Sequence, residues 1–241
     1  SRKNFNKLGG NLAISYEEFF ERIDSIIIST PNANHYEDFK LAVKKGLHIF
    51  IEKPFAHTEK NIDKLLKIQD QNNKIVFAGL NLRFHPAVQF AKEKITDMGI
   101  PIWARFVASS YLPDWRPGKD YQSNYAADKK TGGVIFDFIH EFDLACHILG
   151  SAKVVSSISS SSNLIDIESD DCADIVLEHL NGQRSSIHVD YLTRPAFRNS
   201  DIVCEKGRIN IDIKNRIIKI FDNKNKIIEN KTYESSINDD Y

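Results

Sequence analysis

Residues 26–54 read IIISTPNANHYEDFKLAVKKGLHIFIEKP, and this stretch decides the fold of the first third of the chain. Its opening run, Ile26 to Ile28, is continuous and β-branched, which is typical of a strand buried on both faces of a parallel sheet. An amphipathic helix follows and ends at Gly46. Residues 48–51 then form a second apolar run. The stretch therefore predicts one strand–helix–strand unit with a right-handed crossover.

The same rhythm continues on both sides of this unit. Upstream, Ser15 and Glu18 match the S-x-x-E capping box and predict a short helix. Downstream, Thr58 is the predicted N-cap of another helix, and residues 75–78 predict a third strand. The apolar stripe of that helix comprises Ile62, Leu65, Leu66 and Ile68. Strands that alternate with helices in this way are typical of a parallel βαβ sheet.

After about Arg83 the pattern changes. Apolar residues alternate over 102–108, as on a half-buried strand, and a polar loop over 111–130 precedes a helix pattern over 133–149. From Val154 onward the chain reads mostly as strands. Hairpin turns are predicted at Lys206-Gly207, Lys214-Asn215 and Asn223–Lys226. The second half therefore predicts a largely antiparallel sheet with one or more helices on a face.

Composition narrows the class of protein. The chain has 241 residues, 41% hydrophobic and 27% charged, which is ordinary for a folded protein of one large domain or two small ones. Its net charge of −1 provides no global basic field for nucleic acid or an anionic membrane. No apolar run approaches the roughly 20 residues of a membrane span. The three cysteines (146, 172 and 204) are odd in number and widely spaced, which favours a reducing, cytoplasmic compartment.

Two clusters of reactive side chains follow the first two predicted strands. Residues 30–35, Thr-Pro-Asn-Ala-Asn-His, lie at the carboxyl end of the first strand, where open α/β sheets bind ligands, although taken alone they are better explained as a helix N-cap turn. Glu52-Lys53-Pro54 follows the second strand. Pro54 restricts Lys53 to extended geometry, and their peptide bond is a candidate for the cis form. A fixed ammonium there can polarise an oxygen or contact a phosphate or ribose, although a solvated surface lysine explains the tripeptide equally well.

A third cluster lies in the predicted helix, within residues 132–143, GGVIFDFIHEFD. Asp137, His140 and Asp143 are spaced to share one helix face. Aspartate beside histidine is the usual means of setting an imidazole's orientation and basicity. Two alternatives stay open: a buried, hydrogen-bonded histidine, and a metal site formed with His147. Because H-E-x-x-H and C-x-x-C patterns are absent, the sequence predicts no metal ligand.

Taken in order, these segments resemble the Gfo/Idh/MocA family of NAD(P)-dependent oxidoreductases, named for glucose–fructose oxidoreductase and inositol dehydrogenase. The matching pieces are the strand-T-P-N-x-x-H of residues 26–35, K-x-G-x-H-x-x-x-E-K-P of residues 44–54, N-L-R-F-H-P of residues 81–86 and G-G-x-x-x-D…H-x-x-D of residues 132–143. Residues 111–121 resemble a subgroup often linked with surface-sugar biosynthesis. Glu-Lys-Pro alone is a weak signal, but the ordered set is specific and spans about residues 13–150.

The resemblance implies a fold of the α/β plus α+β type. A partial Rossmann domain (1–82) that lacks its first βα unit is followed by an α/β domain (83–241) with a large, mostly antiparallel open sheet. It implies NAD or NADP as cofactor, and hydride transfer between the nicotinamide and a carbon of a sugar, polyol or nucleotide sugar. It also implies a homo-oligomer formed through the exposed face of the C-terminal sheet, with no nucleic-acid or membrane partner.

The resemblance also assigns roles to residues. Lys53, Asp137 and His140 match the family's catalytic lysine, aspartate and histidine. We expect His140 to transfer the proton of the reacting oxygen, Asp137 to orient it, and Lys53 to stabilise that oxygen and contact the nicotinamide ribose. The residues expected to line the cofactor are Thr30, Pro31, Asn32, His35, Glu52, Lys53 and Arg83. Those expected to contact the substrate are Trp115, Arg116, Tyr121 and Asp143, and Arg194 and Arg198 are further candidates for an anionic group unless they are simply solvated.

The chain departs from the family pattern in two ways. Asp137 and His140 are three residues apart where many members have four, and Glu141 follows the histidine. The G-x-G-x-x-G turn that cradles a pyrophosphate is absent. We therefore expect a chain truncated before its first βα turn and before a final helix. The segment Ser1-Arg2-Lys3, with two basic residues, is either an NADP-selecting segment or a solvated terminus.

Two other functions stay open at this stage. One is a non-catalytic binding or regulatory protein that has kept the fold. The other is a metal-dependent isomerase or hydrolase that uses His140, Asp143 and His147.

Overall fold

The computed structural model describes residues 15–57 and 59–234. The chain divides into two compact units, Ser1–Gly79 and Leu80–Tyr241, called here the N-terminal and C-terminal units. From the sequence, we expect the boundary between the two domains after residue 82, three residues later. The predicted N-cap Thr58 and the basic segment Ser1–Lys3 lie outside the described residues.

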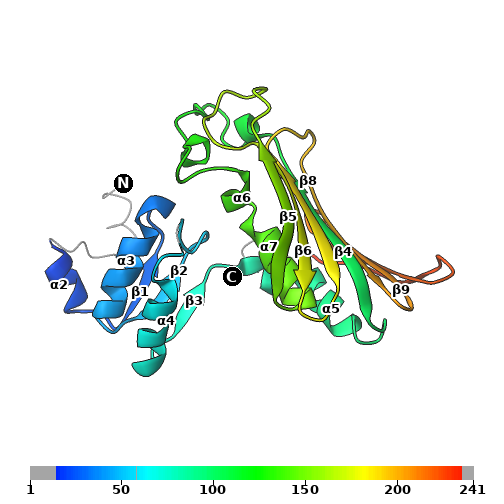
Figure 1. Cartoon of the computed structure of the whole chain (residues 1–241), viewed down its shortest axis with the longest axis horizontal. Helices are drawn as coiled ribbons and strands as arrows, with labels where there is room; N and C mark the ends of the chain where they lie inside the picture. Colours follow the sequence, from blue (N-terminus) through cyan, green and yellow to red (C-terminus); the bar gives the residue numbers. More distant parts are fainter. Residues whose placement is uncertain (1–14, 58, 235–241) are drawn as a thin grey trace. The chain divides into compact units, whose positions relative to one another are not determined.

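The N-terminal unit is built on a three-stranded parallel sheet (Figure 1). Its strands, in the spatial order β1-β2-β3, are β1 (Ser25–Ile28), β2 (His48–Ile51) and β3 (Val76–Ala78). Its helices are α2 (Tyr16–Phe20), α3 (Asn32–Lys44) and α4 (Ile62–Gln71). The strand–helix–strand unit predicted from residues 26–54 is confirmed, but β1 is not buried on both faces, because Ile27 is 72% exposed.

Local interactions explain most of these elements. The backbone N–H of Glu18 donates to Ser15 Oγ at 3.2 Å, so the predicted capping box begins α2. The α4 stripe differs from prediction: Ile68 is 41% exposed, whereas Gln69 is buried and its Nε2 donates to the Leu47 carbonyl at 3.0 Å. Gln69 lies one turn after the buried Leu65, so helical geometry brings its amide against the buried backbone.

The C-terminal unit contains an eight-stranded sheet in the order β11-β10-β9-β8-β4-β7-β6-β5. Its strands are β4 (Pro101–Ser109), β5 (Ala152–Ser160), β6 (Cys172–His179), β7 (Arg184–Asp190), β8 (Phe197–Cys204), β9 (Gly207–Asp212), β10 (Ile217–Asp222) and β11 (Ile227–Thr232). β4 pairs parallel with β7, and all other neighbours pair antiparallel. The largely antiparallel sheet is confirmed, with the parallel β4–β7 pair at its centre.

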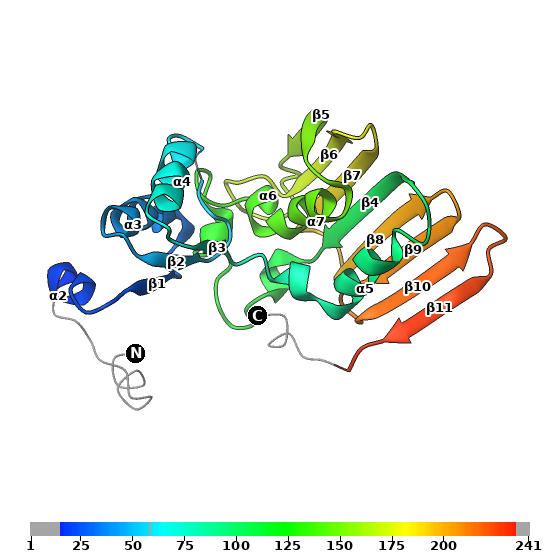
Figure 2. The same ribbon diagram turned by 90° about the horizontal axis from the view of Figure 1, so that it is seen from below.

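Helices cover one face of this sheet (Figure 2). The helical elements are η1 (Asn81–Phe84), α5 (Pro86–Lys94), η2 (Leu112–Asp114), η3 (Tyr125–Ala127), α6 (Val134–Asp137) and α7 (Ile139–Leu149). Within the described residues no helix lies on the opposite face, which is called here the open face (Figures 1 and 2). None of the described helices is long and apolar enough to cross a membrane.

The helix predicted over residues 133–149 is two helices. The chain breaks at Phe138 (φ −98°, ψ 31°), between α6 and α7. The Phe138 ring makes an edge contact with Trp115, 6.0 Å between centroids, and a tilted contact with Tyr191 at 5.9 Å. Tertiary packing therefore takes precedence over the apolar helical pattern here, and Asp137 does not share a helix with His140 and Asp143.

Gly207, at the tight hairpin between β8 and β9, provides a test of how closely the chain must approach β10. A Cβ on Gly207 would overlap the carbonyl oxygen of Phe221 on β10. We expect Gly207→Ala to lower the free energy of unfolding by roughly 3 kcal/mol, because the backbone of β10 must shift.

The matched control is Gly182→Ala. Gly182 has φ +85° and nothing within 4 Å of its Cβ position, so only backbone strain of about 1 kcal/mol is expected. Urea unfolding of both variants measures the difference. Equal destabilisation would show that the contact with β10 is unimportant.

Candidate active site

Two predicted segments and Gly79 lie at one edge of the N-terminal sheet. Because β1, β2 and β3 are parallel, their carboxyl ends meet at the same edge. Residues 30–35 follow β1, Glu52-Lys53-Pro54 follows β2, and Gly79 follows β3. This is the edge at which open α/β sheets bind ligands.

His35 links two of these segments. Its Nδ1 lies 2.7 Å from the Pro54 carbonyl oxygen and its Nε2 lies 2.8 Å from the Thr30 carbonyl oxygen. The ring is 1% exposed, so it contacts backbone and not solvent. The Lys53–Pro54 peptide bond is cis, as the sequence allowed. His35 thus positions the turn that carries Lys53, and a direct cofactor contact by this side chain stays a prediction.

The other predicted cofactor residues surround the start of α3. Pro31 is its N-cap and makes no side-chain capping bond, while Asn32 is its buried first residue. Thr30 Oγ1 donates to Asp38 Oδ2 at 2.6 Å. The segment is therefore a helix N-cap turn, and the same turn also presents the positive end of the helix dipole at the ligand edge.

Glu52 and Gly79 shape the neighbouring part of the edge. The backbone N–H of Lys53 donates to Glu52 Oε2 at 3.3 Å. A Cβ on Gly79 would lie 3.1 Å from Glu52 Oε2 and 3.3 Å from the Phe50 ring. Glycine therefore leaves open a space that any larger side chain would fill.

The C-terminal unit has its own pocket, of about 550 Å³, which contains His140. It is lined by residues from η1, the end of β4, the junction of α6 and α7, the start of β8 and the β9–β10 turn. Three cations, Arg198, Lys214 and Arg216, share this lining with His140. Lys214 Nζ donates to the Ala196 carbonyl at 2.8 Å, which holds its ammonium at the wall. The pocket therefore joins a histidine to a positively charged wall.

Asp137 is a buried carboxylate held by two phenols. Tyr125 Oη donates to Asp137 Oδ1 at 2.7 Å, and Tyr191 Oη donates to Oδ2. Burial, and then the Asp137 charge, raise the pKa of both Tyr125 and Tyr191, so both phenols stay protonated and can donate. The expected role of Asp137 in orienting His140 stays a prediction.

Two adjacent glycines explain how Tyr125 reaches Asp137. A Cβ on Gly132 would overlap the carbonyl oxygens of Tyr125 and Ala126. Gly133 has φ +107°, and its N–H donates to the Ala126 carbonyl at 3.0 Å. The Gly-Gly pair thus allows close approach of η3 to the start of α6.

Glu141 forms a buried ion pair with Arg198. Arg198 Nε donates to Glu141 Oε1 at 2.6 Å, and its second nitrogen donates to Oε2 at 2.8 Å. The Glu141 side chain is 2% exposed and that of Arg198 is 23% exposed. Glu141, which departs from the family pattern in the sequence, therefore holds an arginine at the pocket wall.

Arg83 and Asp143 bind each other. Arg83 Nε lies 2.9 Å from Asp143 Oδ2, and its second nitrogen also donates to the carboxylate. This pairing raises the pKa of Arg83. Arg83 was expected at the cofactor and Asp143 at the substrate, but the structure pairs them with each other. Neither belongs to the described lining of the His140 pocket.

The predicted substrate residues of the 111–121 loop also lie outside the described lining of that pocket. Trp115 Nε1 donates to Ser110 Oγ at 2.8 Å, and its ring packs on Phe138 and Tyr191. Tyr121 Oη accepts the Asp166 N–H at 3.3 Å, and Arg116 is exposed. Their contact with substrate stays a prediction.

The alternative metal site does not form in the described part of the chain. Asp143 binds Arg83, and His147 lies 3.4 Å from Lys92 Nζ. Burial and then the Lys92 charge lower the pKa of His147. The described groups of three His, Cys, Asp or Glu side chains close enough to share an ion do not include His140, Asp143 and His147.

Comparisons with known proteins identify the family. The model of the oxidoreductase family with an NAD-binding Rossmann fold matches residues 2–80, and the Gfo/Idh/MocA C-terminal domain model matches residues 102–210. The chain belongs to the Gfo/Idh/MocA family. The Rossmann-like parallel sheet and the C-terminal mixed sheet expected for this family are confirmed.

Relatives within the Gfo/Idh/MocA family act on several sugars. The chain is 28% identical over 130 residues to 2,7-anhydro-N-acetylneuraminate hydratase of Mediterraneibacter gnavus, covering 54% of this chain and 34% of that protein. It is 23% identical over 208 residues to UDP-N-acetylglucosamine 3-dehydrogenase of Acidithiobacillus ferrooxidans, covering 86% and 61%. The chain thus spans about a third to three fifths of the length of these curated relatives.

A solved structure shows the same fold. An inositol dehydrogenase homologue of Azotobacter vinelandii, complexed with NAD⁺, superposes with a TM-score of 0.84 at 17% identity. The match covers 98% of this chain and 66% of that one.

Sequence reasoning missed several residues of this Gfo/Idh/MocA site. Tyr125 and Tyr191 bind Asp137 from positions 12 before it and 54 after it. Lys214 and Arg216 lie in a hairpin turn, where lysine and arginine carry no distinctive sequence signal. These residues become recognisable as neighbours of the site only in the folded sheet, in which β4 pairs with β7 and β8, and β8 pairs with β9.

The Glu141–Arg198 pair predicts a large stability effect. We expect Glu141→Ala to lower the free energy of unfolding by about 3 kcal/mol, because it leaves a mostly buried guanidinium without its carboxylate. Thermal and urea unfolding measure the change.

The chain offers a matched exposed pair as a control. Arg194 Nε lies 2.9 Å from Asp114 Oδ2, with side chains 58% and 62% exposed. Asp114→Ala should change stability little, because solvent screens an exposed pair. Equal losses of stability in Glu141→Ala and Asp114→Ala would show that burial does not strengthen the Glu141–Arg198 pair.

Proposed function

We propose that the protein is an NAD(P)-dependent oxidoreductase that moves a hydride between a nicotinamide and a carbon of a sugar, polyol or nucleotide sugar. The observation that carries this proposal is the His140 pocket, in a chain whose N-terminal unit matches the NAD-binding Rossmann model of the family. The relatives include a dehydrogenase of a UDP-sugar and a structure with NAD⁺ bound.

The N-terminal unit has features that fit a dinucleotide. The start of α3 lies at the carboxyl edge of the sheet, where the positive end of its helix dipole favours an anionic ligand. Gly79 preserves a space beside Glu52 that a Cβ would fill. Thr30, Pro31, Asn32 and Glu52 would hold the cofactor here, and its nicotinamide supplies a carbon that accepts or donates hydride.

The residues of this chain supply proton transfer and charge stabilisation. In this proposal His140 removes or delivers the proton of the reacting oxygen, and Asp137 sets its orientation. Lys53, on a turn held by His35, stabilises the negative charge that develops on that oxygen. The buried Tyr125 and Tyr191 phenols keep the Asp137 carboxylate in place.

The charge of the pocket indicates a substrate class. Arg198, Lys214 and Arg216 favour a substrate with a carboxylate or phosphate group. Two relatives are named for such substrates, a neuraminate derivative with a carboxylate and a UDP-sugar with a diphosphate. We therefore infer that the sugar carries an anionic group.

The catalytic proposal is tested with the full-length gene product. Absorbance of the reduced nicotinamide is followed with NADH and NADPH against keto-sugars and nucleotide sugars. We expect His140→Ala to reduce kcat by about 10²–10⁴-fold, the usual contribution of general acid–base catalysis, with cofactor affinity nearly unchanged.

His147→Ala is the matched control. It removes a histidine from the same helix that is outside the described pocket lining, and it should retain turnover. Wild-type turnover in His140→Ala would contradict the assigned role. Cofactor binding by the wild type without hydride transfer to any anionic or neutral sugar would favour a non-catalytic binding protein.

We also propose that the protein is a cytoplasmic homo-oligomer joined through the open face of the C-terminal sheet. Its three cysteines form no disulfide. The open face carries exposed apolar side chains, such as Ile158 (68% exposed) and Trp103 (42%). Apolar area of this kind stabilises contact between copies when it is buried.

Sedimentation tests this interface. We expect Ile158→Asp to shift the oligomer to smaller species, because it places a charge in a desolvated contact. Leu180→Asp, at an 83% exposed position of the β6–β7 turn, should leave the mass unchanged. A wild-type monomer would contradict the proposal.

A further inference from the structure

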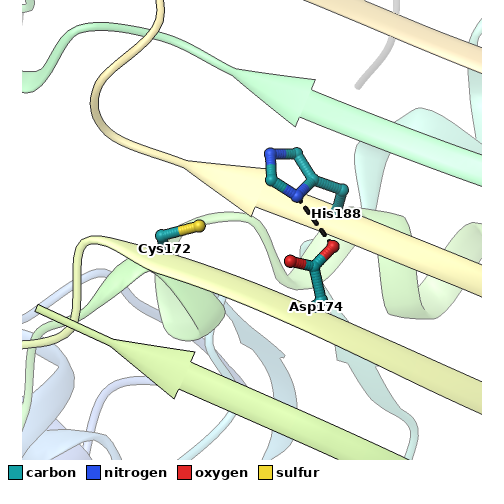
Figure 3. A group of neighbouring side chains, drawn as sticks. All are labelled: Cys172, Asp174 and His188. Carbon is teal, nitrogen blue, oxygen red and sulfur yellow. Dashed lines mark hydrogen bonds and ion pairs between the residues drawn. The ribbon is translucent and has the colours of Figure 1, made fainter. Parts of the chain in front are cut away.

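A cysteine, an aspartate and a histidine lie close together on the neighbouring strands β6 and β7, away from the residues assigned to hydride transfer. Cys172 and Asp174 are two residues apart on β6, so they point to the same side of the sheet. In the antiparallel register, Asp174 lies opposite His188 of β7, and Cys172 lies opposite Asp190. Figure 3 shows Cys172, Asp174 and His188 together on this surface.

The distances are those of a nearly formed metal site. One ligand atom from each of Cys172, Asp174 and His188 lies within 4.8 Å of the others. His188 Nδ1 and Asp174 Oδ1 are 2.8 Å apart. Tetrahedral zinc, with bonds of about 2.0–2.3 Å, needs its ligand atoms roughly 3.3–3.7 Å apart. Small rotations of the side chains therefore suffice, because the strand register already fixes the backbone positions.

Asp190 acts as the outer partner that metal-binding histidines require. Its Oδ2 lies 3.2 Å from His188 Nε2, the ring nitrogen that points away from Asp174. Asp190 is 4% exposed, and its Oδ1 accepts the N–H groups of Leu192 at 2.8 Å and Thr193 at 2.7 Å. A carboxylate fixed in this way favours the tautomer with hydrogen on Nε2, which leaves the Nδ1 lone pair for a metal.

The donor set selects the kind of ion. One thiolate, one carboxylate and one neutral imidazole carry two negative charges, which a divalent cation balances. Thiolate with imidazole is typical of zinc, whereas calcium and magnesium prefer oxygen ligands alone. A cation bound here would take the place of the direct contact between His188 Nδ1 and Asp174 Oδ1.

We propose that Cys172, Asp174 and His188 bind one Zn²⁺ ion on the open face of the C-terminal sheet, with Asp190 positioning His188 and water as the fourth ligand. The site is separate from the residues proposed for hydride transfer, so its failure would leave that proposal intact. It shares the open face with the proposed contact between copies, because Ile158 of β5 pairs with Asp174.

Metal titration of the full chain tests the site. After dialysis against a chelator, Zn²⁺ is titrated calorimetrically, and Co²⁺ is followed by its visible and thiolate charge-transfer absorption. We expect one ion per chain and a tetrahedral cobalt spectrum. Asp190→Asn should weaken binding by about 10–100-fold, the usual effect of an outer-shell carboxylate.

Variants of the ligands identify the donors. Cys172→Ser should abolish the thiolate charge-transfer band, and His188→Ala should remove saturable binding. The matched controls are Cys146→Ser, an exposed thiol on α7, and Asp201→Asn, a carboxylate on β8. Both should bind as the wild type does.

Folding is checked in the same variants by circular dichroism, and zinc should raise the melting temperature of the wild type but not of His188→Ala. The proposal is overturned by an absence of saturable binding in the wild type, by unchanged binding in Cys172→Ser and His188→Ala, or by a stoichiometry of half an ion per chain.

Discussion

The position of β4 is the constraint on which the C-terminal unit depends. This strand pairs with β7 on one side and β8 on the other, although both come much later in the chain. Its inward residues Ala104, Phe106 and Ala108 are at most 1% exposed, so they form the centre of the core. The end of β4 also lines the His140 pocket. The pocket can therefore form only when strands distant in sequence have already paired.

Two buried carboxylate side chains are the second feature that organises the C-terminal unit. Asp137 and Glu141 are both buried on the helical face of the sheet, but they are stabilised differently. Asp137 accepts hydrogen bonds from neutral phenols, whereas Glu141 binds a guanidinium. The first arrangement fixes the Asp137 carboxylate on α6, just before the helix that carries His140, and the second places a cation at the pocket wall. Burial makes both interactions costly to lose.

Sequence reasoning was most accurate for local structure. The strand at Ile26–Ile28, the capping box at Ser15 and the hairpin turn near Gly207 were predicted correctly, because each depends on neighbours a few residues away. The burial of that strand on both faces was not, because burial depends on the rest of the fold, and Ile27 is 72% exposed. It was wrong about a single helix through Phe138, because the ring packs on side chains that the sequence places far away. For the site, it named His140 and Asp137 but neither of the tyrosines that hold Asp137.

The sequence by itself determined the family and the order of the elements, because ordered motifs and apolar periodicity are properties of the local chain. Tertiary structure alone decided which side chains meet. The Arg83–Asp143 pair, the cations around His140 and the cluster of Cys172, Asp174 and His188 each join distant segments. The Arg83–Asp143 pair depends on how the helices η1 and α7 pack. Strand register places Cys172 and Asp174 beside His188, and a shift of one residue would turn the side chains of a strand to the other face.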